Sequence, residues 1–157
     1  MDRKLLGEAI KKMELLDIYL NESKLTRDKD FDSGAPAQTL RQQNKLAVKA
    51  DILGTEDNPD DKSGLLRALV TVGLRFVSSP DQNDDKANEK PVVRAEIEAT
   101  FCALYRYSEE MTDDEIAEFL RFNAVHNVWP FWREHALRVS AESKLPRPSI
   151  PLMKPKG

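Results

Sequence analysis

The sequence has one cysteine, Cys102, among its 157 residues. A single thiol cannot form an internal disulfide, and chains without disulfides are typical of the reducing cytoplasm. No apolar run reaches the ~20 residues that a membrane-spanning helix requires. The N-terminal stretch MDRKLLGEAIKKMELL is charged and amphipathic, with no signal-peptide core. We therefore expect a cytoplasmic protein with no membrane insertion.

Glycine is scarce as well, at six residues, and none of them forms a phosphate-cradling loop. The sequence contains no GxGxxG, P-loop or GxSxG motif, each of which carries a defined chemistry. Its two histidines, His126 and His135, are nine positions apart, which does not place them on one helix face as metal ligands. The acidic stretches at residues 56–61 and 81–89 lack the spacing of a calcium loop. We therefore expect no enzyme activity, no metal site and no cofactor.

An excess of positive charge is absent too. The 24 basic and 27 acidic residues leave a net charge of -3, whereas nucleic-acid-binding domains favour basic faces. Hydrophobic residues make up 40% and charged residues 32% of the chain, which is typical of a soluble, ordered protein. A chain of this length suits one domain with a real core. We expect a single domain over residues 1–157 that does not bind nucleic acid.

Strands are predicted by four stretches in which apolar and polar residues alternate. They lie near residues 12–20, 46–52, 65–77 and 92–107, separated by segments rich in turn residues. The phase of the first stretch slips by one residue at Leu15–Leu16, as a β-bulge would cause. Residues 3–11 before it are typical of a short helix, and a helix that continues from residue 3 is the alternative. Four strands in succession predict an antiparallel sheet over residues 12–107 with one apolar face.

A helical cover for that face is predicted near the C-terminal end. Thr112 and Glu115 form the pattern of a capping box, which marks the start of a helix. Pro130 is costly inside a helix but suits the first turn of one, so we expect two helices within residues 112–145. Their expected bounds are about residues 113–126 and 130–144. The prolines that follow predict an extended, proline-rich tail over residues 146–157. The fold class is therefore α+β, a four-stranded antiparallel sheet covered on one face by two C-terminal helices.

Two groups of residues are candidate contact sites. Trp129, Phe131 and Trp132 surround a proline and point in different directions from a helix start, so they cannot easily all face one sheet. We expect at least one of them in the core and the others in a subunit interface or a groove. Glu96 and Glu98 lie on the outward face of the last strand. They are either part of a solvated sheet face or an acidic docking surface for a basic partner.

The order of these elements, together with local motifs, resembles SecB, the bacterial protein-export chaperone. The first motif is WPFWRE at residues 129–134, which opens the long helix, and the second is LPRPSIPL at residues 145–152. The stretch EIEATF at residues 96–101, followed by an acidic spacer and a helix, fits the same order. The resemblance covers most of the chain by layout and residues 93–152 by motif.

This resemblance implies a homotetramer, a dimer of dimers with its helices between sheets, that holds unfolded polypeptides without ATP. The clients implied are unfolded preproteins or, in SecB-like relatives that serve toxin–antitoxin systems, an antitoxin. The residues implied in client contact are large apolar ones of the two motifs: Trp129, Phe131, Trp132, Leu145, Ile150 and Leu152. An acidic outer sheet face docks the translocase ATPase SecA in the family, which implies that role for Glu96 and Glu98.

The chain departs from the SecB pattern in three places, the first being its N-terminal region, which is longer and more helix-like. Ser143-Lys144 stands where the family usually has a glycine before a Leu-Pro or Phe-Pro pair. The sequence ends MKPKG, with two lysines, in place of the flexible acidic tail that helps to engage SecA in the family, so SecA binding stays open. The chain thus resembles a divergent SecB-like protein. Two other functions stay open at this point: a non-catalytic adaptor of the same fold that binds one folded partner, and a small-molecule-binding α+β domain or enzyme.

Overall fold

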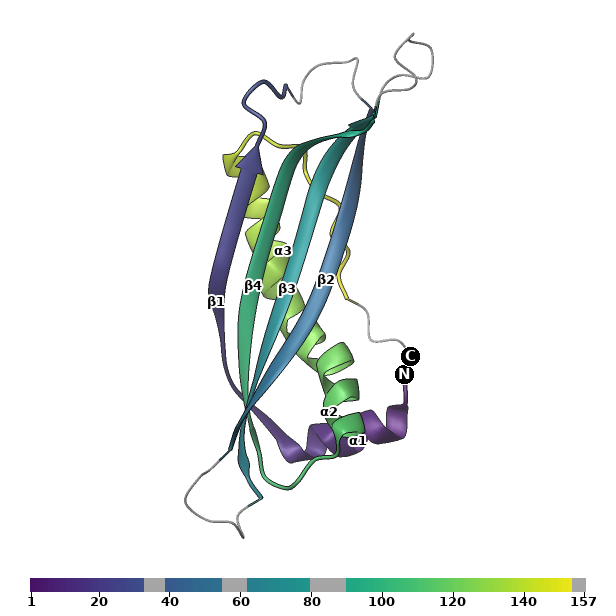
Figure 1. Cartoon of the computed structure of the whole chain (residues 1–157), viewed down its shortest axis with the longest axis vertical. Helices are drawn as coiled ribbons and strands as arrows, with labels where there is room; N and C mark the ends of the chain where they lie inside the picture. The colour runs from purple at the N-terminus through teal and green to yellow at the C-terminus, as the bar shows by residue number, and fades with distance from the viewer. Residues whose placement is uncertain (33–38, 55–61, 80–89, 154–157) are drawn as a thin grey trace.

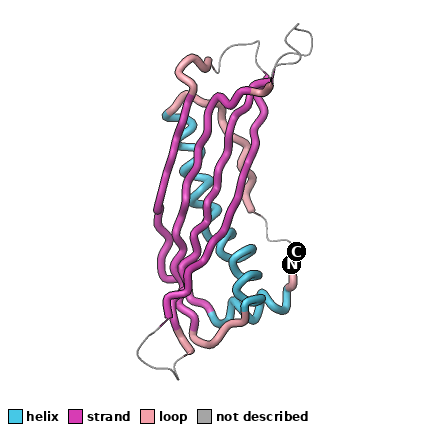
Figure 2. Tube along the Cα trace, in the orientation of Figure 1, coloured by secondary structure: helices cyan, strands magenta, loops and turns pink. Residues whose placement is uncertain are grey.

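The computed structural model describes residues 1–32, 39–54, 62–79 and 90–153. It contains a four-stranded antiparallel sheet with helices on one of its faces (Figure 1, Figure 2). The strands are β1 (Met13–Arg27), β2 (Thr39–Gly54), β3 (Gly64–Ser79) and β4 (Val92–Tyr107). The predicted α+β class and antiparallel sheet are confirmed.

The strands lie in the order β1-β4-β3-β2, so the first two strands of the chain form the two edges of the sheet (Figure 1). The β1–β4 register shifts between Leu15 and Asp17, which confirms the predicted bulge at Leu15–Leu16. It shifts again between Leu20 and Glu22, at a second bulge that was not predicted. Each bulge takes one residue out of the pairing, so Leu15, Ile18, Leu20 and Leu25 stay on one face despite the slips in phase.

The apolar face predicted for the two central strands is buried. Its members are Leu66, Ala68, Val70, Val72, Leu74 and Phe76 of β3, and Ala95, Ile97, Ala99, Phe101, Ala103 and Tyr105 of β4. Val93 follows the same alternation in the sequence as these residues, but it is exposed, because the β3–β4 register shifts beside it. The Tyr105 ring packs edge-on against Phe119 with ring centres 4.8 Å apart, and its hydroxyl accepts a 2.9 Å hydrogen bond from Asn127. Sheet and helices therefore share one core.

The first two helices are tied together by one carboxylate. The helix predicted at residues 3–11 is α1 (Arg3–Lys12), and β1 begins directly after it, so the alternative of a longer helix is wrong. The predicted capping box of Thr112 and Glu115 is present at the start of α2 (Asp113–Glu118). Glu115 also accepts hydrogen bonds from Lys12 Nζ, each 3.1 Å long. The hydrogen bond from the Thr112 backbone and the one from Lys12 lower the pKa of Glu115, so this residue both starts α2 and anchors α1.

The helix break predicted at Pro130 is wrong. α3 (Val125–Glu142) continues through Pro130, and the change in helical geometry lies upstream, in the π-helix η1 (Phe119–Ala124). A proline inside a helix costs about 3 kcal/mol. Its neighbours Val128 and Trp132 are buried in the core, and each such burial contributes about 1.5–3 kcal/mol. Packing against the sheet therefore outweighs the local cost of the proline.

The end of α3 redirects the chain through a Schellman motif built on a lysine. Lys144 has a φ of 53°, a left-handed conformation that usually selects glycine. The N–H of Leu145 closes the motif by donating to the carbonyl oxygen of Ser140 at 2.9 Å. This is the place where the sequence has Ser-Lys instead of the glycine of SecB. The chain then turns back and crosses behind the sheet, and the later part of residues 145–153 runs beside β2 (Figure 1).

Candidate functional site

The β1 edge carries exposed apolar residues on the face that α3 covers elsewhere. Leu15, Leu20 and Leu25 point to the same side as the core residues of β4, yet they remain exposed, Leu20 by 47%. Phe131 of α3 is also exposed and lies beside Phe101, with ring centres 6.4 Å apart. We call Leu15, Leu20, Leu25 and Phe131 the β1-side strip.

A hydrogen bond joins α3 to β1 next to this strip. His135 Nε2 lies 3.1 Å from the Ser23 hydroxyl, and the imidazole ring is edge-on to Phe101. The side chain is buried. This burial lowers the pKa of His135, and the positive charge of Arg138 lowers it further. The folded protein therefore favours the neutral ring, which fits a structural role for this histidine.

We expect stability to fall as the pH drops from about 8 to about 5.5, because the unfolded chain protonates His135 near pH 6.5 and the folded chain resists this protonation. The stability that neutral His135 contributes is present above about pH 6.5 and is lost as the pH falls below that value. Urea denaturation across this range measures the free energy of unfolding. His135→Gln should flatten the profile, and His126→Gln, at an exposed position of the same helix, is the control substitution. Equal slopes for His135→Gln and the unmodified protein would contradict this role.

The β2 edge carries a second set of exposed apolar residues. Leu46, 49% exposed, and Ile52 face inward from β2, and Val48 and Ala50 between them are half-buried. Ile52 also lines a cavity of about 170 Å³. The apolar walls of this cavity include Met13, Leu66, Tyr107, Met111 and Ile116. We call Leu46, Ile52 and this cavity the β2-side surface.

The C-terminal tail is held beside β2 through its backbone. The bonded residues are Ser149, Ile150 and Pro151. Gln42 of β2 forms two hydrogen bonds with Ser149. Its Nε2 donates to the Ser149 carbonyl oxygen at 3.0 Å, and its Oε1 accepts from the Ser149 N–H at 2.8 Å. From α3, Arg133 Nε donates to the carbonyl oxygen of Ile150 at 3.0 Å. Trp129 Nε1 donates to the carbonyl oxygen of Pro151 at 2.8 Å. The tail therefore bridges α3 and β2.

The structure separates the six residues predicted to contact clients. Three of them are buried in the core: Trp132, Leu145 and Ile150. Trp129 is half-buried and bonded to the tail, whereas Phe131 and Leu152 are exposed. Of these six residues, only Phe131 and Leu152 present a large exposed apolar side chain in the single chain. The client roles of all six remain predictions.

The exposed leucines of the two edge strands were not among the residues predicted to make contacts. The sequence does hold a signal for them, because Leu46 and Ile52 follow the same alternation as the buried residues of β3. Alternation predicts which face of a strand is apolar, but it does not predict whether a helix covers that face. That depends on the strand order, which places β1 and β2 at the edges.

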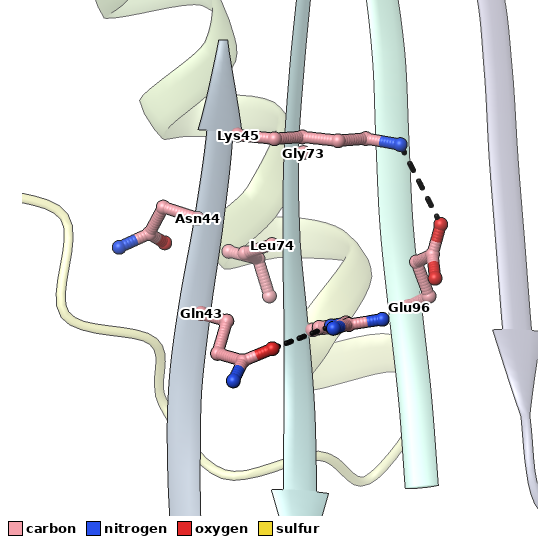
Figure 3. A pocket seen from close by; sticks show the side chains of 7 residues that line it. Gln43, Asn44, Lys45, Gly73, Leu74 and Glu96 are labelled. Carbon is pink, nitrogen blue, oxygen red and sulfur yellow. Dashed lines mark hydrogen bonds and ion pairs between the residues drawn. The ribbon is translucent and has the colours of Figure 1, made fainter. Parts of the chain in front are cut away.

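Glu96 and Glu98 face outward from β4, as predicted, but they share this face with a cation. Lys45 of β2 reaches across Gly73 and forms an ion pair with Glu96 at 3.7 Å (Figure 3). It also forms an ion pair with Glu98. A Cβ atom at Gly73 would lie 2.7 Å from Lys45 Cε, so the absence of a side chain there makes room for this reach. The hydrogen bond to Glu98 raises the pKa of Lys45. Docking of a partner by the two glutamates remains a prediction, and such a partner must compete with Lys45.

The part of the chain that the structure describes contains no group of three or more His, Cys, Asp and Glu residues placed to hold a metal ion. Of the helices in that part, none combines the length and apolar character that crossing a bilayer demands. Cys102 is a free, buried thiol. Its hydrogen bond with the Tyr19 side chain raises the pKa of Tyr19.

Comparison with solved structures assigns the fold. The chain matches the SecB-like chaperone Rv1957 of Mycobacterium tuberculosis, solved in complex with a ChAD peptide from the HigA1 antitoxin Rv1956, over 99% of this chain and 100% of that one, with a TM-score of 0.72 and 16% sequence identity. It also aligns with a protein of unknown function from Streptococcus agalactiae over 88% of this chain and 96% of that one, with a TM-score of 0.38 and 11% identity. No protein-family model matches the chain, and no curated protein matches its sequence. The predicted resemblance is confirmed at the level of the fold, and the chain has the fold of a SecB-like chaperone.

Proposed function

We propose that the protein is an ATP-independent chaperone that holds unfolded polypeptides in the cytoplasm. The observation that carries this proposal is the pair of uncovered apolar edges on one sheet face, where Leu20 of β1 and Leu46 of β2 are 47% and 49% exposed. Contiguous apolar surface is rarely left open on a protein unless a partner covers it. Two such surfaces on one chain need two kinds of cover, which we assign to a second subunit and to a client.

Assembly is assigned to the β1-side strip. β1 is an edge strand, so one side of its backbone has no strand neighbour in the described sheet and can pair with an edge of a second copy. In a two-fold arrangement the β1-side strips of two copies meet, so the apolar residues of the strip are buried on both copies. The homotetramer that the SecB resemblance implies, a dimer of dimers, can be built around this contact.

Client binding is assigned to the β2-side surface. Leu46, Ile52 and the cavity beside Ile52 offer apolar contacts to short segments of an unfolded chain, and weak contacts on several subunits add through avidity. The Mycobacterium tuberculosis chaperone with this fold is solved with an antitoxin peptide. That complex supports an antitoxin as a client here, and unfolded preproteins stay part of the proposal. Docking of SecA on Glu96 and Glu98 stays part of the proposal.

An aggregation assay tests the proposal. A guanidinium-unfolded enzyme is diluted into buffer, and light scattering reports its aggregation with and without the protein. We expect suppression at a near-stoichiometric ratio without nucleotide, and a solution mass of roughly 72 kDa for four copies of the 17.9 kDa chain. A monomer that leaves aggregation unchanged contradicts the proposal. Saturable binding to one folded protein, with indifference to unfolded chains, would favour the adaptor of the same fold.

A further inference from the structure

We infer that the C-terminal tail is an internal substitute for a client, and that an extended apolar segment of an unfolded chain displaces it. The inference rests on the proposed function and adds a binding site to it. We call Gln42, Trp129 and Arg133, the three residues that hold the tail, the tail seat. Because Gln42, Leu46 and Ile52 all face inward from β2, the seat extends the β2-side surface along the same strand.

The tail seat recognises backbone and not side chains. All four hydrogen bonds between the seat and the tail involve backbone N–H or C=O groups of residues 149–151. The Gln42 amide pairs with the donor and the acceptor of one residue, much as a neighbouring strand does in a sheet. Every extended polypeptide presents such groups at a similar spacing, so the seat does not depend on the sequence of its occupant.

The buried side chains of the tail indicate what else an occupant needs. Leu145, Pro148 and Ile150 are buried against the fold, whereas Ser149 between the last two is exposed. An occupant therefore presents aliphatic or proline side chains on one side and tolerates polar ones on the other. This composition is found in apolar segments of unfolded proteins, which supports an extended unfolded chain as the occupant.

The tail is held in a way that allows a client segment to displace it. Residues 145–153 form neither helix nor strand. Three of the four hydrogen bonds between the seat and the tail are exposed to solvent. A client that uses the same seat binds only the chains whose tail is released, so its apparent affinity is reduced by the fraction of chains that are competent. Loosening the tail without changing the seat should therefore strengthen client binding.

The test uses the full chain and a fluorescein-labelled peptide with the sequence SKLPRPSIPLM of residues 143–153. Ser149→Pro removes the N–H that bonds Gln42, and Ile150→Ser removes buried apolar surface. By fluorescence anisotropy we expect a Kd about tenfold lower for both variants than for the unmodified protein, which corresponds to about 1.4 kcal/mol. Should Ile150→Ser fail to fold, Ser149→Pro decides, because Ser149 is exposed. A Kd that is equal or higher overturns the inference.

Two controls separate the seat from the tail. Gln42→Ala loosens the tail but also removes a seat residue, so it should not tighten peptide binding. Gln43→Ala on the opposite face, where Gln43 bonds Arg75, should bind like the unmodified protein. Tighter peptide binding by Gln42→Ala than by Ser149→Pro would overturn the role of the seat.

Reduced, carboxymethylated α-lactalbumin, an unfolded chain, is the second probe. If Ser149→Pro gains affinity for the peptide while no variant binds the unfolded α-lactalbumin, the tail seat is supported and the chaperone proposal fails. If all variants bind the unfolded α-lactalbumin equally and Ser149→Pro gains no affinity for the peptide, the chaperone proposal is supported and the tail inference is overturned.

Discussion

Replacing Trp132 with alanine is expected to lower the free energy of unfolding by about 3–5 kcal/mol. Trp132 is 2% exposed and belongs to the core between α3 and the sheet. Protein interiors are close-packed, so losing the indole leaves a cavity that the surroundings cannot fill completely. Since domains are stable by only about 5–15 kcal/mol, this loss removes a large share of the total. Urea denaturation followed by far-ultraviolet circular dichroism measures it.

Leu152→Ala is the control for this substitution. Leu152 is 71% exposed, and truncation of such a residue should change stability by about 0.5 kcal/mol or less. Unaltered stability of Trp132→Ala would show that the ring does not support the core. The pair also guards against a false conclusion, because a loss of holding activity in Trp132→Ala would reflect unfolding and not a missing client contact.

The second large effect is expected at the β1 edge, where Leu20→Asp should dissociate the assembly. In a two-fold contact the substitution occurs twice, and each buried, unpaired carboxylate costs several kcal/mol. Size exclusion coupled to light scattering should show a species smaller than the tetramer. Circular dichroism should remain that of the folded chain, because Leu20 is already 47% exposed in the single chain.

Leu46→Asp is a matched control at the opposite edge of the same sheet face, where Leu46 is 49% exposed. It should keep the tetramer and lose suppression of aggregation, because we assign this edge to the client. The assignment of the two edges is wrong if Leu20→Asp stays tetrameric or if Leu46→Asp dissociates.

The middle of the sheet could be predicted from the sequence because its local pattern and its environment agree. Strands β3 and β4 have a neighbour on both sides, and every inward residue of β3 from Leu66 to Phe76 is buried. The start of α2 was equally predictable, since the capping box of Thr112 and Glu115 is a local interaction. Pro130 was misjudged because its local cost competes with the burial of Val128 and Trp132, and a local rule does not include that burial.

The fate of the tail could not be predicted in the same way. Leu145 and Ile150 have the apolar character of contact residues, and nothing in their own stretch distinguishes a client contact from the core. Their burial depends on the left-handed conformation of Lys144 and on bonds between Gln42 and Ser149, which lie 107 positions apart in the sequence. Pairing over such a distance is a property of the folded chain.

The strand order also has a consequence during synthesis of the protein on the ribosome. β1 ends at Arg27, whereas β4, its neighbour in the described sheet, begins at Val92. Ribosomes add ~5–20 residues per second, so β1 waits on the order of several seconds for its partner to be synthesised. During that time Leu15, Leu20 and Leu25 have no sheet to join. A nascent copy is therefore, for those seconds, an unfolded polypeptide with exposed apolar residues, the kind of molecule that we propose the finished protein binds.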